Sequence, residues 1–213
     1  MNSIAENIRA IRSRMAAAAE AAGRDPGEIL LVGASKMNGA EACRAAIAGG
    51  VDALGENRVQ EMTEKLARNA YEGAPLHFIG HLQRNKVRQV VGTVSLIHSV
   101  GSWPLLEVNV GGEESKSGFA PEAVYEAAER AKALGNIRVR GLMTIPPIQR
   151  EPHGNLPFFA KIARLYVDIS RNLYDNEFTY LSMGMSDDFE DAITAGATVV
   201  RVGSAIFGHR QYH

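Results

Sequence analysis

Short apolar runs alternate along this chain with longer amphipathic stretches. Eight runs have the length and the β-branched content of strands, at 30–36, 51–56, 75–80, 94–100, 105–110, 139–145, 179–185 and 198–203. Stretches rich in Ala, Glu, Arg and Leu, which favour helices, separate most of them at 39–49, 57–70, 83–91, 121–134, 157–174 and 187–195. This alternation predicts an α/β fold in which helices cover a sheet of parallel strands.

A further helix is expected ahead of the first strand. Ser3 is suited to be its N-cap, Glu6 follows three residues later, and isoleucines recur at helical spacing before Gly23 ends the segment. Eight strands within 213 residues favour a single (β/α)8 TIM barrel domain over residues 1–213, with this extra helix at its N-terminus. An open doubly wound sheet is the structural alternative.

The connection between the fourth and fifth runs is too short for a parallel sheet. Only residues 101–104 separate them, whereas a parallel crossover needs roughly a dozen residues or more. Either the two runs form an antiparallel hairpin, or a helix is missing from the chain here. We favour the missing helix, because a barrel that lost it would expose apolar strand surface to water.

Composition and charge narrow the function classes. The formal net charge of −1 gives no basic surface for nucleic acid. Cys43 is the only cysteine, so the chain has no intrachain disulfide and fits a reducing compartment. The N-terminal residues lack the apolar centre of a signal peptide, and no window approaches membrane-spanning length. We therefore expect a cytoplasmic protein without nucleic-acid or membrane partners.

Lys36 is the first candidate for chemistry. It closes the apolar run 30–36 and so brings a lone amine to the C-terminal end of a strand, where barrels place their sites. Such an amine can form a Schiff base, although a solvated charge or surface ion pair is the ordinary alternative.

Two later segments offer an anion site, because each runs from a strand through Gly and Ser into a helix start. Backbone N–H groups at helix starts bind phosphate, and barrels often hold phosphate after strands seven and eight. Ser186, Gly203 and Ser204 are therefore the phosphate candidates. For Ser186, a simple N-cap before Asp187 is the alternative.

Further polar residues are expected at the same end of the barrel. Arg201 lies within an apolar strand, where it needs a carboxylate, a phosphate or a ring nitrogen as partner, and a structural salt bridge remains an alternative. Asn57 follows the second strand and His77 lies in the third, so both are candidates for a cofactor pocket, as is Gln83. A lysine amine, a phosphate cradle and a barrel together suggest pyridoxal phosphate.

Other chemistries find less support in the sequence. His77 and His81 are four residues apart, which spans about 13 Å in a strand and is too far for one metal ion. The chain has no Gly-x-Ser-x-Gly elbow, phosphate-loop Gly-Lys-Ser/Thr run or Gly-x-Gly-x-x-Gly turn. Hydrolase, nucleotide triphosphatase and dehydrogenase activities are accordingly disfavoured.

Specific motifs follow one another over nearly the whole chain. They are Val-Gly-Ala-Ser-Lys at 32–36, Gly-Glu-Asn-Arg-Val-Gln-Glu at 55–61, His-Phe-Ile-Gly-His-Leu-Gln-Arg-Asn-Lys at 77–86, Val-Asn-Val-Gly-Gly-Glu-Glu-Ser-Lys-Ser-Gly-Phe at 108–119, Arg-Gly-Leu-Met-Thr-Ile-Pro at 140–146, Leu-Ser-Met-Gly-Met-Ser-Asp-Asp at 181–188 and Arg-Val-Gly-Ser-Ala-Ile-Phe-Gly at 201–208. In these motifs the chain resembles the YggS/PROSC family of pyridoxal phosphate homeostasis proteins.

The resemblance implies a barrel like the N-terminal domain of alanine racemase, which is fold type III among pyridoxal phosphate proteins. It implies that the cofactor is held as an aldimine on Lys36, that the phosphate contacts fall on Ser186, Gly203 and Ser204, and that Arg201 lies near the cofactor. Members are regarded as carriers or regulators of pyridoxal phosphate and amino-acid balance, without an established catalytic reaction. The family has a helix between strands four and five, which supports a missing helix near residues 101–104.

An enzyme is the alternative that the resemblance leaves open. A racemase-like enzyme of weak activity would use the same lysine together with an acid or base on the opposite face of the cofactor. Racemases complete their site with a second domain and a partner subunit, and we expect the eight strands to take up this whole chain. The binding hypothesis is therefore favoured, with a monomer and with cofactor-accepting enzymes and amino acids as possible partners.

Overall fold

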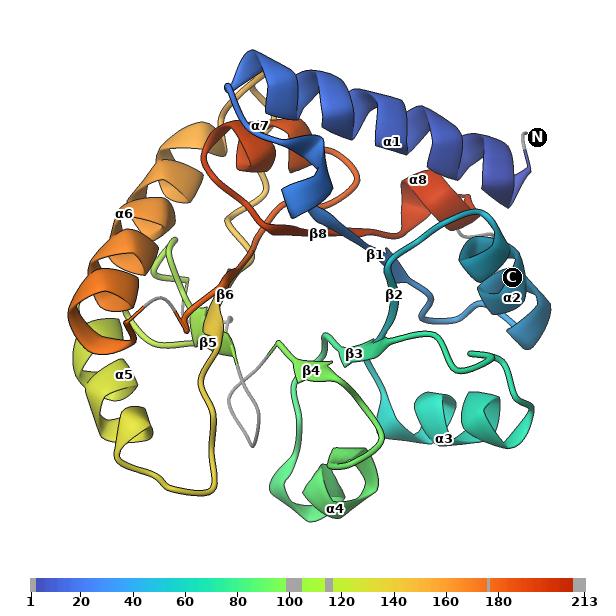
Figure 1. Ribbon diagram of the computed structural model, residues 1–213, viewed down its shortest axis with the longest axis horizontal. Coiled ribbons are helices and arrows are strands. Elements are labelled where there is room, and N and C mark those ends of the chain that lie inside the picture. The colour runs from blue at the N-terminus through green and yellow to red at the C-terminus, as the bar shows by residue number, and fades with distance from the viewer. Residues whose placement is uncertain (1–2, 99–104, 114–116, 176, 209–213) are drawn as a thin grey trace.

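Eight short parallel strands form the centre of the computed structural model, which describes residues 3–98, 105–113, 117–175 and 177–208 (Figure 1). The strands are β1 (Leu30–Ala34), β2 (Ala53–Glu56), β3 (Leu76–Phe78), β4 (Leu96–Ile97), β5 (Leu105–Val108), β6 (Gly141–Thr144), β7 (Tyr180–Ser182) and β8 (Val199–Val202). Their order is β4-β3-β2-β1-β8-β7-β6-β5, and every paired neighbour is parallel. The predicted alternation of strands and helices is confirmed.

Each strand is buried on both faces, as a barrel requires. Val32, Ala53 and Val199 form one buried cluster inside the ring of strands. The intervening residues Leu31 and Leu54 point outward and belong to the main core between strands and helices. Side chains alternate between faces with a period of two residues, so this parity decides which strand residues face the barrel interior.

The barrel is nearly closed. β4 and β5 stand at the two ends of the hydrogen-bonded order, and the described residues show no pairing between them. Leu96 of β4 and Leu105 of β5 nevertheless share a buried cluster with Met143. The hairpin and open-sheet alternatives are therefore wrong. The short join at 101–104, with Ser99 and Val100 before it, lies outside the described residues.

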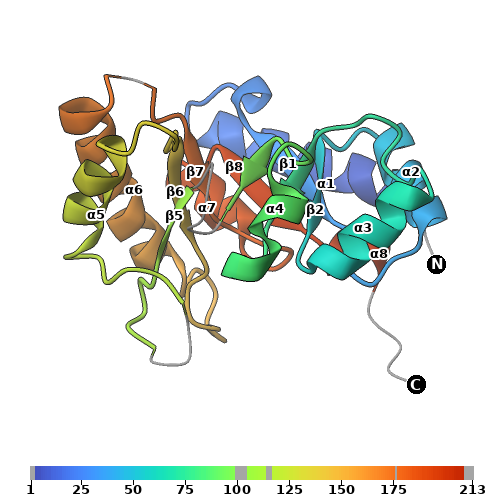
Figure 2. The same ribbon diagram turned by 90° about the horizontal axis from the view of Figure 1, so that it is seen from below.

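Helices surround the strands on the outside (Figures 1 and 2). They are α1 (Ile4–Ala21), α2 (Ala40–Ala48), α3 (Val59–Ala67), α4 (Val87–Val90), α5 (Val124–Lys132), α6 (Leu156–Leu173), α7 (Phe189–Thr194) and α8 (Ser204–Phe207), with short 3-10 turns η1 (Pro26–Glu28) and η2 (Arg84–Lys86). No helix among these is both long enough and apolar enough to cross a membrane.

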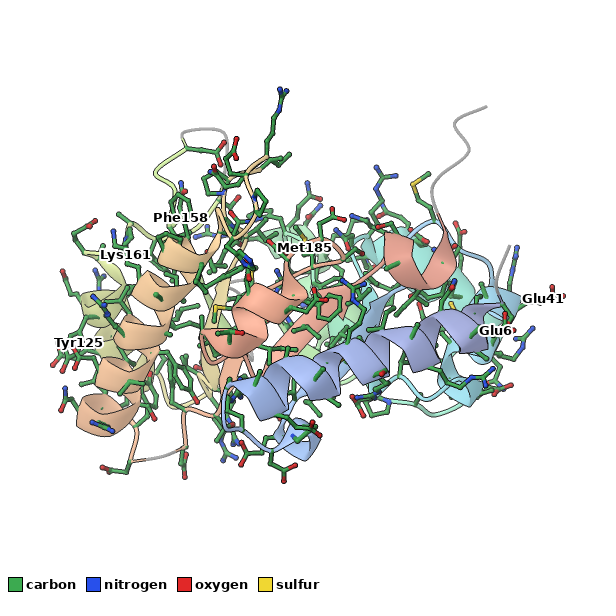
Figure 3. All side chains as sticks on the ribbon, turned by 90° about the horizontal axis from the view of Figure 1, so that it is seen from above. Glu6, Glu41, Tyr125, Phe158, Lys161 and Met185 are labelled. Carbon is green, nitrogen blue, oxygen red and sulfur yellow. The ribbon has the colours of Figure 1, made fainter. Side chains whose placement is uncertain are left out.

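The extra N-terminal helix is present with the predicted cap. Ser3 Oγ accepts a hydrogen bond from the Glu6 backbone N–H, and the Ser3 N–H donates to the Glu6 carboxylate. Figure 3 shows Glu6 at this end of α1. The helix packs against α7 and α8, and Asn7 Nδ2 donates to the Ile206 carbonyl at 2.9 Å. α1 therefore supports the outer side of the segments that follow β7 and β8.

Candidate functional site

Lys36 lies at the mouth of the barrel beside the end of β8. It follows β1 by two residues and is half-buried. β1 pairs with β8 so that Val32 is in register with Arg201. A Cβ atom built on Gly203 would lie 3.5 Å from Ala34 Cβ. Strand pairing thus brings the lysine and the segment after β8 together, although they are far apart in the sequence.

Ser186 contacts the start of α8. Its Oγ accepts hydrogen bonds from the backbone N–H groups of Gly203 and Ala205, each at 3.3 Å. Both bonds are long, so these donors would bind a stronger acceptor more closely. Ser204, the first residue of α8, is exposed. The three phosphate candidates therefore lie together, on the segments that follow β7 and β8.

The alternative of an N-cap role for Ser186 is wrong. α7 begins at Phe189, with Asp188 in the capping position. Asp188 Oδ1 accepts from the Met185 N–H at 2.6 Å, and its Oδ2 accepts from Asn155 Nδ2 at 2.7 Å. Asp188 therefore organises this loop and leaves the Ser186 hydroxyl directed at the β8 segment.

Arg201 is buried inside the barrel without a carboxylate partner. Its side chain donates to Ser182 Oγ at 2.6 Å and to the Thr144 carbonyl at 3.1 Å, and only 5% of the residue is exposed. The described residues place no carboxylate within ion-pair distance of it, so the salt-bridge alternative is wrong. Burial lowers the pKa of Arg201 to about 10, although the charges of Asp188 and Glu107 oppose this effect. The guanidinium remains charged at neutral pH.

A buried chain of hydrogen bonds runs from Arg201 to two histidines. Ser182 Oγ lies 2.9 Å from His98 Nδ1, and His98 Nε2 lies 3.1 Å from His77 Nδ1. Arg201 can only donate to Ser182, and the described residues offer the Ser182 hydroxyl no other acceptor than His98. His98 therefore carries its proton on Nε2 and donates it to His77 Nδ1, which leaves the His77 proton on Nε2.

Both histidines are neutral near pH 7. Burial lowers the pKa of His77 to about 4. The pKa of His98 lies well below its ordinary value because of burial, with the nearby His77 and Arg201 adding to the effect. Desolvation disfavours the protonated ring in each case. The interior thus presents a cation, Arg201, held by neutral groups only.

Asn57 and Glu107 add polar groups near this mouth. Asn57 Oδ1 is buried and has no hydrogen-bond partner among the described residues. Gly80 packs against Asn57 so closely that a Cβ built on it would lie 2.3 Å from the Asn57 carbonyl oxygen. Glu107 lines a cavity of about 130 Å³ with Asn109, and burial raises its pKa, opposed by His81 and Arg201.

The chain matches a known protein family over nearly its whole length. A family model described as alanine racemase, N-terminal domain, matches residues 1–211. The chain belongs to the alanine racemase N-terminal domain family. A relative named pyridoxal phosphate homeostasis protein, from Pseudomonas aeruginosa, is 43% identical over 230 residues, which cover 100% of this chain and 98% of the relative. The resemblance in the sequence motifs is thereby confirmed.

Two solved structures share the fold of this chain. An unknown protein from Bifidobacterium adolescentis is 36% identical, with a TM-score of 0.88 over 96% of this chain and 94% of that chain. PipY of Synechococcus elongatus, solved with PLP bound, is 30% identical, with a TM-score of 0.81 over 97% of this chain and 100% of that chain. The predicted barrel type is confirmed.

The alignment with the Pseudomonas relative also bears on the short join. It spans 230 positions, whereas this chain has 213 residues, so at least 17 aligned positions have no residue here. That number is enough for a crossover helix.

Sequence reasoning missed several members of the site. Ser182 and His98 were not singled out, yet they connect Arg201 to His77. Each follows an interior residue at the strand period, Tyr180 in β7 and Leu96 in β4. The two-residue period of these strands was the sequence signal that could have placed Ser182 and His98 in the barrel interior. Gln83, which is also expected to line the pocket, is exposed.

Proposed function

We propose that this protein binds pyridoxal phosphate at the mouth of the barrel and takes part in its homeostasis. One observation carries the proposal: Arg201 is a buried cation held only by neutral groups, at a mouth that also offers an amine and converging backbone donors. This donor set matches a ligand that combines an aldehyde, an aromatic nitrogen and a phosphate. The similarity to PipY, whose structure holds PLP, supports the same ligand.

Each part of that ligand has a candidate partner. The phosphate would bind at Ser186, Gly203 and Ser204, because the two N–H groups that now meet Ser186 Oγ converge on one point. Arg201 would face the ring nitrogen. Asn57 and His77 would line the pocket, and the unpartnered Asn57 Oδ1 needs a donor there.

Lys36 would hold the ligand covalently. A lysine amine condenses with an aldehyde carbon, forming a carbon–nitrogen double bond and releasing one water molecule, and hydrolysis reverses the reaction. Such a link retains the ligand firmly and still allows its release. Retention of this kind suits a carrier that later transfers its ligand to an acceptor enzyme.

Holding the ligand is favoured over turnover by the charge of Arg201. A guanidinium with a pKa of about 10 stays protonated and donates to a ring nitrogen, which then remains unprotonated and withdraws electrons weakly. A racemase would also need an acid or base facing Lys36 across the ligand. His77 and His98 are neutral and bonded to each other, so neither is a ready proton donor.

A visible absorbance titration with pyridoxal phosphate tests the proposal. We expect the wild-type protein to gain the absorbance of a lysine adduct, and Lys36→Ala to gain none. Lys161→Ala is the matched control, because Lys161 lies on the outside of α6, as Figure 3 shows, and pairs with Glu122. Equal absorbance in wild type and Lys36→Ala would contradict the role of Lys36. Efficient conversion of L-alanine to D-alanine would favour the enzyme alternative.

Several wider expectations accompany this proposal. We propose that residues 1–213 act as one barrel domain, that the protein works as a monomer in the cytoplasm, and that enzymes requiring pyridoxal phosphate receive it from this mouth. The nearly continuous ring of strands supports the first of these. Size measurement in solution and co-purification with acceptor enzymes test the others.

A further inference from the structure

A second lysine, Lys65, lies behind the mouth on the outer side of the barrel wall. It belongs to α3, and only 8% of its side chain is exposed. Its Nζ donates to Glu56 Oε1 at 2.6 Å, to the Ser35 carbonyl at 2.8 Å and to Glu61 Oε1 at 2.8 Å. An ammonium group has three N–H donors, so all three are used within the protein.

This network holds both neighbours of Lys36 in the chain. On one side, Ser35 is bonded twice, since its carbonyl accepts from Lys65 and its Oγ donates to Glu56 Oε1 at 2.6 Å. On the other side, the backbone N–H of Met37 donates to Glu61 Oε1. The network therefore joins β2 and α3 to the residues that immediately precede and follow Lys36.

The backbone at Met37 makes such support necessary. Met37 has a φ of 63°, in the left-handed region that a residue with a Cβ rarely adopts. The residue is 67% exposed, so its side chain contributes little packing. The hydrogen bond to Glu61 therefore acts together with two bonds of Asn38, from its N–H to the Ser35 carbonyl at 3.0 Å and from its Nδ2 to the Lys36 carbonyl at 3.1 Å. The bond to Glu61 ties Met37 itself to α3.

The charges within the network favour a fixed arrangement. Burial alone would lower the pKa of Lys65, but the hydrogen bonds with Glu56 and Glu61 outweigh it and raise this pKa. Lys65 therefore stays charged, and its amine is not available as a nucleophile. A buried cation with all its partners in place is costly to rearrange, because each lost partner leaves an unpaired charge.

We propose that Lys65, acting with Glu61, is a positioning residue that sets the direction of the Lys36 amine at the barrel mouth. The inference rests on the proposed attachment of pyridoxal phosphate to Lys36. A displaced amine still lies in the same pocket but reaches the aldehyde carbon less often in a reactive geometry. Loss of the network should therefore slow the covalent step and leave noncovalent binding of the phosphate and ring intact.

Rapid-mixing absorbance measurements separate these two steps. The first-order rate of adduct formation at saturating pyridoxal phosphate reports the covalent step, and the Kd for pyridoxine 5′-phosphate, which has no aldehyde, reports noncovalent binding. For Lys65→Met we expect the rate to fall by about tenfold to a hundredfold, with the Kd for pyridoxine 5′-phosphate within about twofold of wild type. Lys161→Met is the control and should change neither quantity.

Glu61 variants keep the inference testable if Lys65→Met fails to fold. Glu61→Gln retains an oxygen acceptor for the Met37 N–H and should react nearly as fast as wild type, whereas Glu61→Ala loses it and should be slow. Unchanged rates in Lys65→Met and Glu61→Ala would overturn the inference, as would a parallel loss of pyridoxine 5′-phosphate affinity. If the wild-type protein itself formed no adduct, the proposed function would fail first.

Discussion

Arg201 Nη1 lies 2.6 Å from Ser182 Oγ inside the barrel. This bond begins the chain that continues through His98 to His77 and assigns a proton to Nε2 of each ring. We expect two-bond ¹⁵N–¹H correlation spectra near pH 7 to show both histidines as neutral Nε2–H tautomers. In Ser182→Ala, His98 Nδ1 loses its donor, so a population protonated on Nδ1 should appear.

Ser95→Ala is the control for that measurement. Ser95 precedes β4 and donates only to the Leu76 carbonyl, at 3.0 Å. Its loss should leave both ring tautomers unchanged. Finding His98 protonated on Nδ1 in the wild-type protein would reverse the direction of the chain and contradict the assignment.

The neutral histidines make stability depend on pH. The pKa of His77 is about 4 in the folded protein and near 6.5 when the chain is unfolded. Between these values only the unfolded state binds the proton, so stability rises with pH through this window and is lost as pH falls. Because folded His77 stays neutral in this window, its contribution should make the free energy of unfolding about 2 kcal/mol lower at pH 5 than at pH 7.

Urea unfolding at pH 7 and pH 5 measures this dependence. His77→Gln should lose less stability than wild type over that interval, by about the same 2 kcal/mol. His81→Gln is the control, because His81 is exposed. An identical pH dependence in wild type and His77→Gln would contradict the lowered pKa of the folded state.

Ser186 should contribute modestly to retention of the phosphate. Its hydroxyl meets the N–H groups of Gly203 and Ala205, and those donors remain when the hydroxyl is removed. For Ser186→Ala we expect the Kd for pyridoxal phosphate to rise by about three- to tenfold, with a smaller rise for the exposed Ser204→Ala. Equilibrium dialysis measures both values, and inorganic phosphate should compete less well in the variants.

Ser170→Ala provides the matched control for these serines. Ser170 lies on α6, with its Oγ 3.4 Å from the Phe178 carbonyl, and takes no part in the mouth. The Kd of Ser170→Ala for pyridoxal phosphate should equal that of the wild-type protein. A Kd unchanged in both Ser186→Ala and Ser204→Ala would place the phosphate elsewhere.

Gly80 should not accept a side chain. A Cβ there would lie 2.3 Å from the Asn57 carbonyl oxygen and 2.7 Å from Asn57 Cα. We expect Gly80→Ala to lower the unfolding free energy by about 1–3 kcal/mol and to weaken cofactor retention by moving Asn57. Gly39→Ala, where a Cβ meets no atom within 4 Å, is the control. Equal free energies of unfolding for both variants in urea would contradict this prediction, because they would show that the backbone around Gly80 shifts at little cost to make room for a Cβ.

The strands and the mouth were predictable because they depend on local patterns. Apolar runs located all eight strands, and parallel strands place their C-terminal ends together, which brings Lys36 near Gly203. The capping box of Ser3 and Glu6 was likewise predictable from the sequence, because both partners lie within one helical turn. These features require only short-range spacing and one rule of topology.

The networks were not predictable, because their partners come from distant elements. Glu56 at the end of an apolar strand needs a partner, but the choice of Lys65 depends on how α3 packs against β1 and β2. Likewise, His98 and Ser182 meet only because β4 and β7 face each other across the interior. The Ser186 alternative failed for the same reason, since Asp188 and the β8 segment decide its role together.

The central claim is that Lys36 carries pyridoxal phosphate. It is tested most directly by loading the purified protein with pyridoxal phosphate, reducing it with borohydride and mapping the modified peptide by mass spectrometry. We predict one reduced adduct, on Lys36, and none on Lys65, whose three donors are engaged within the protein. An adduct on another lysine, or none after loading, would contradict the account.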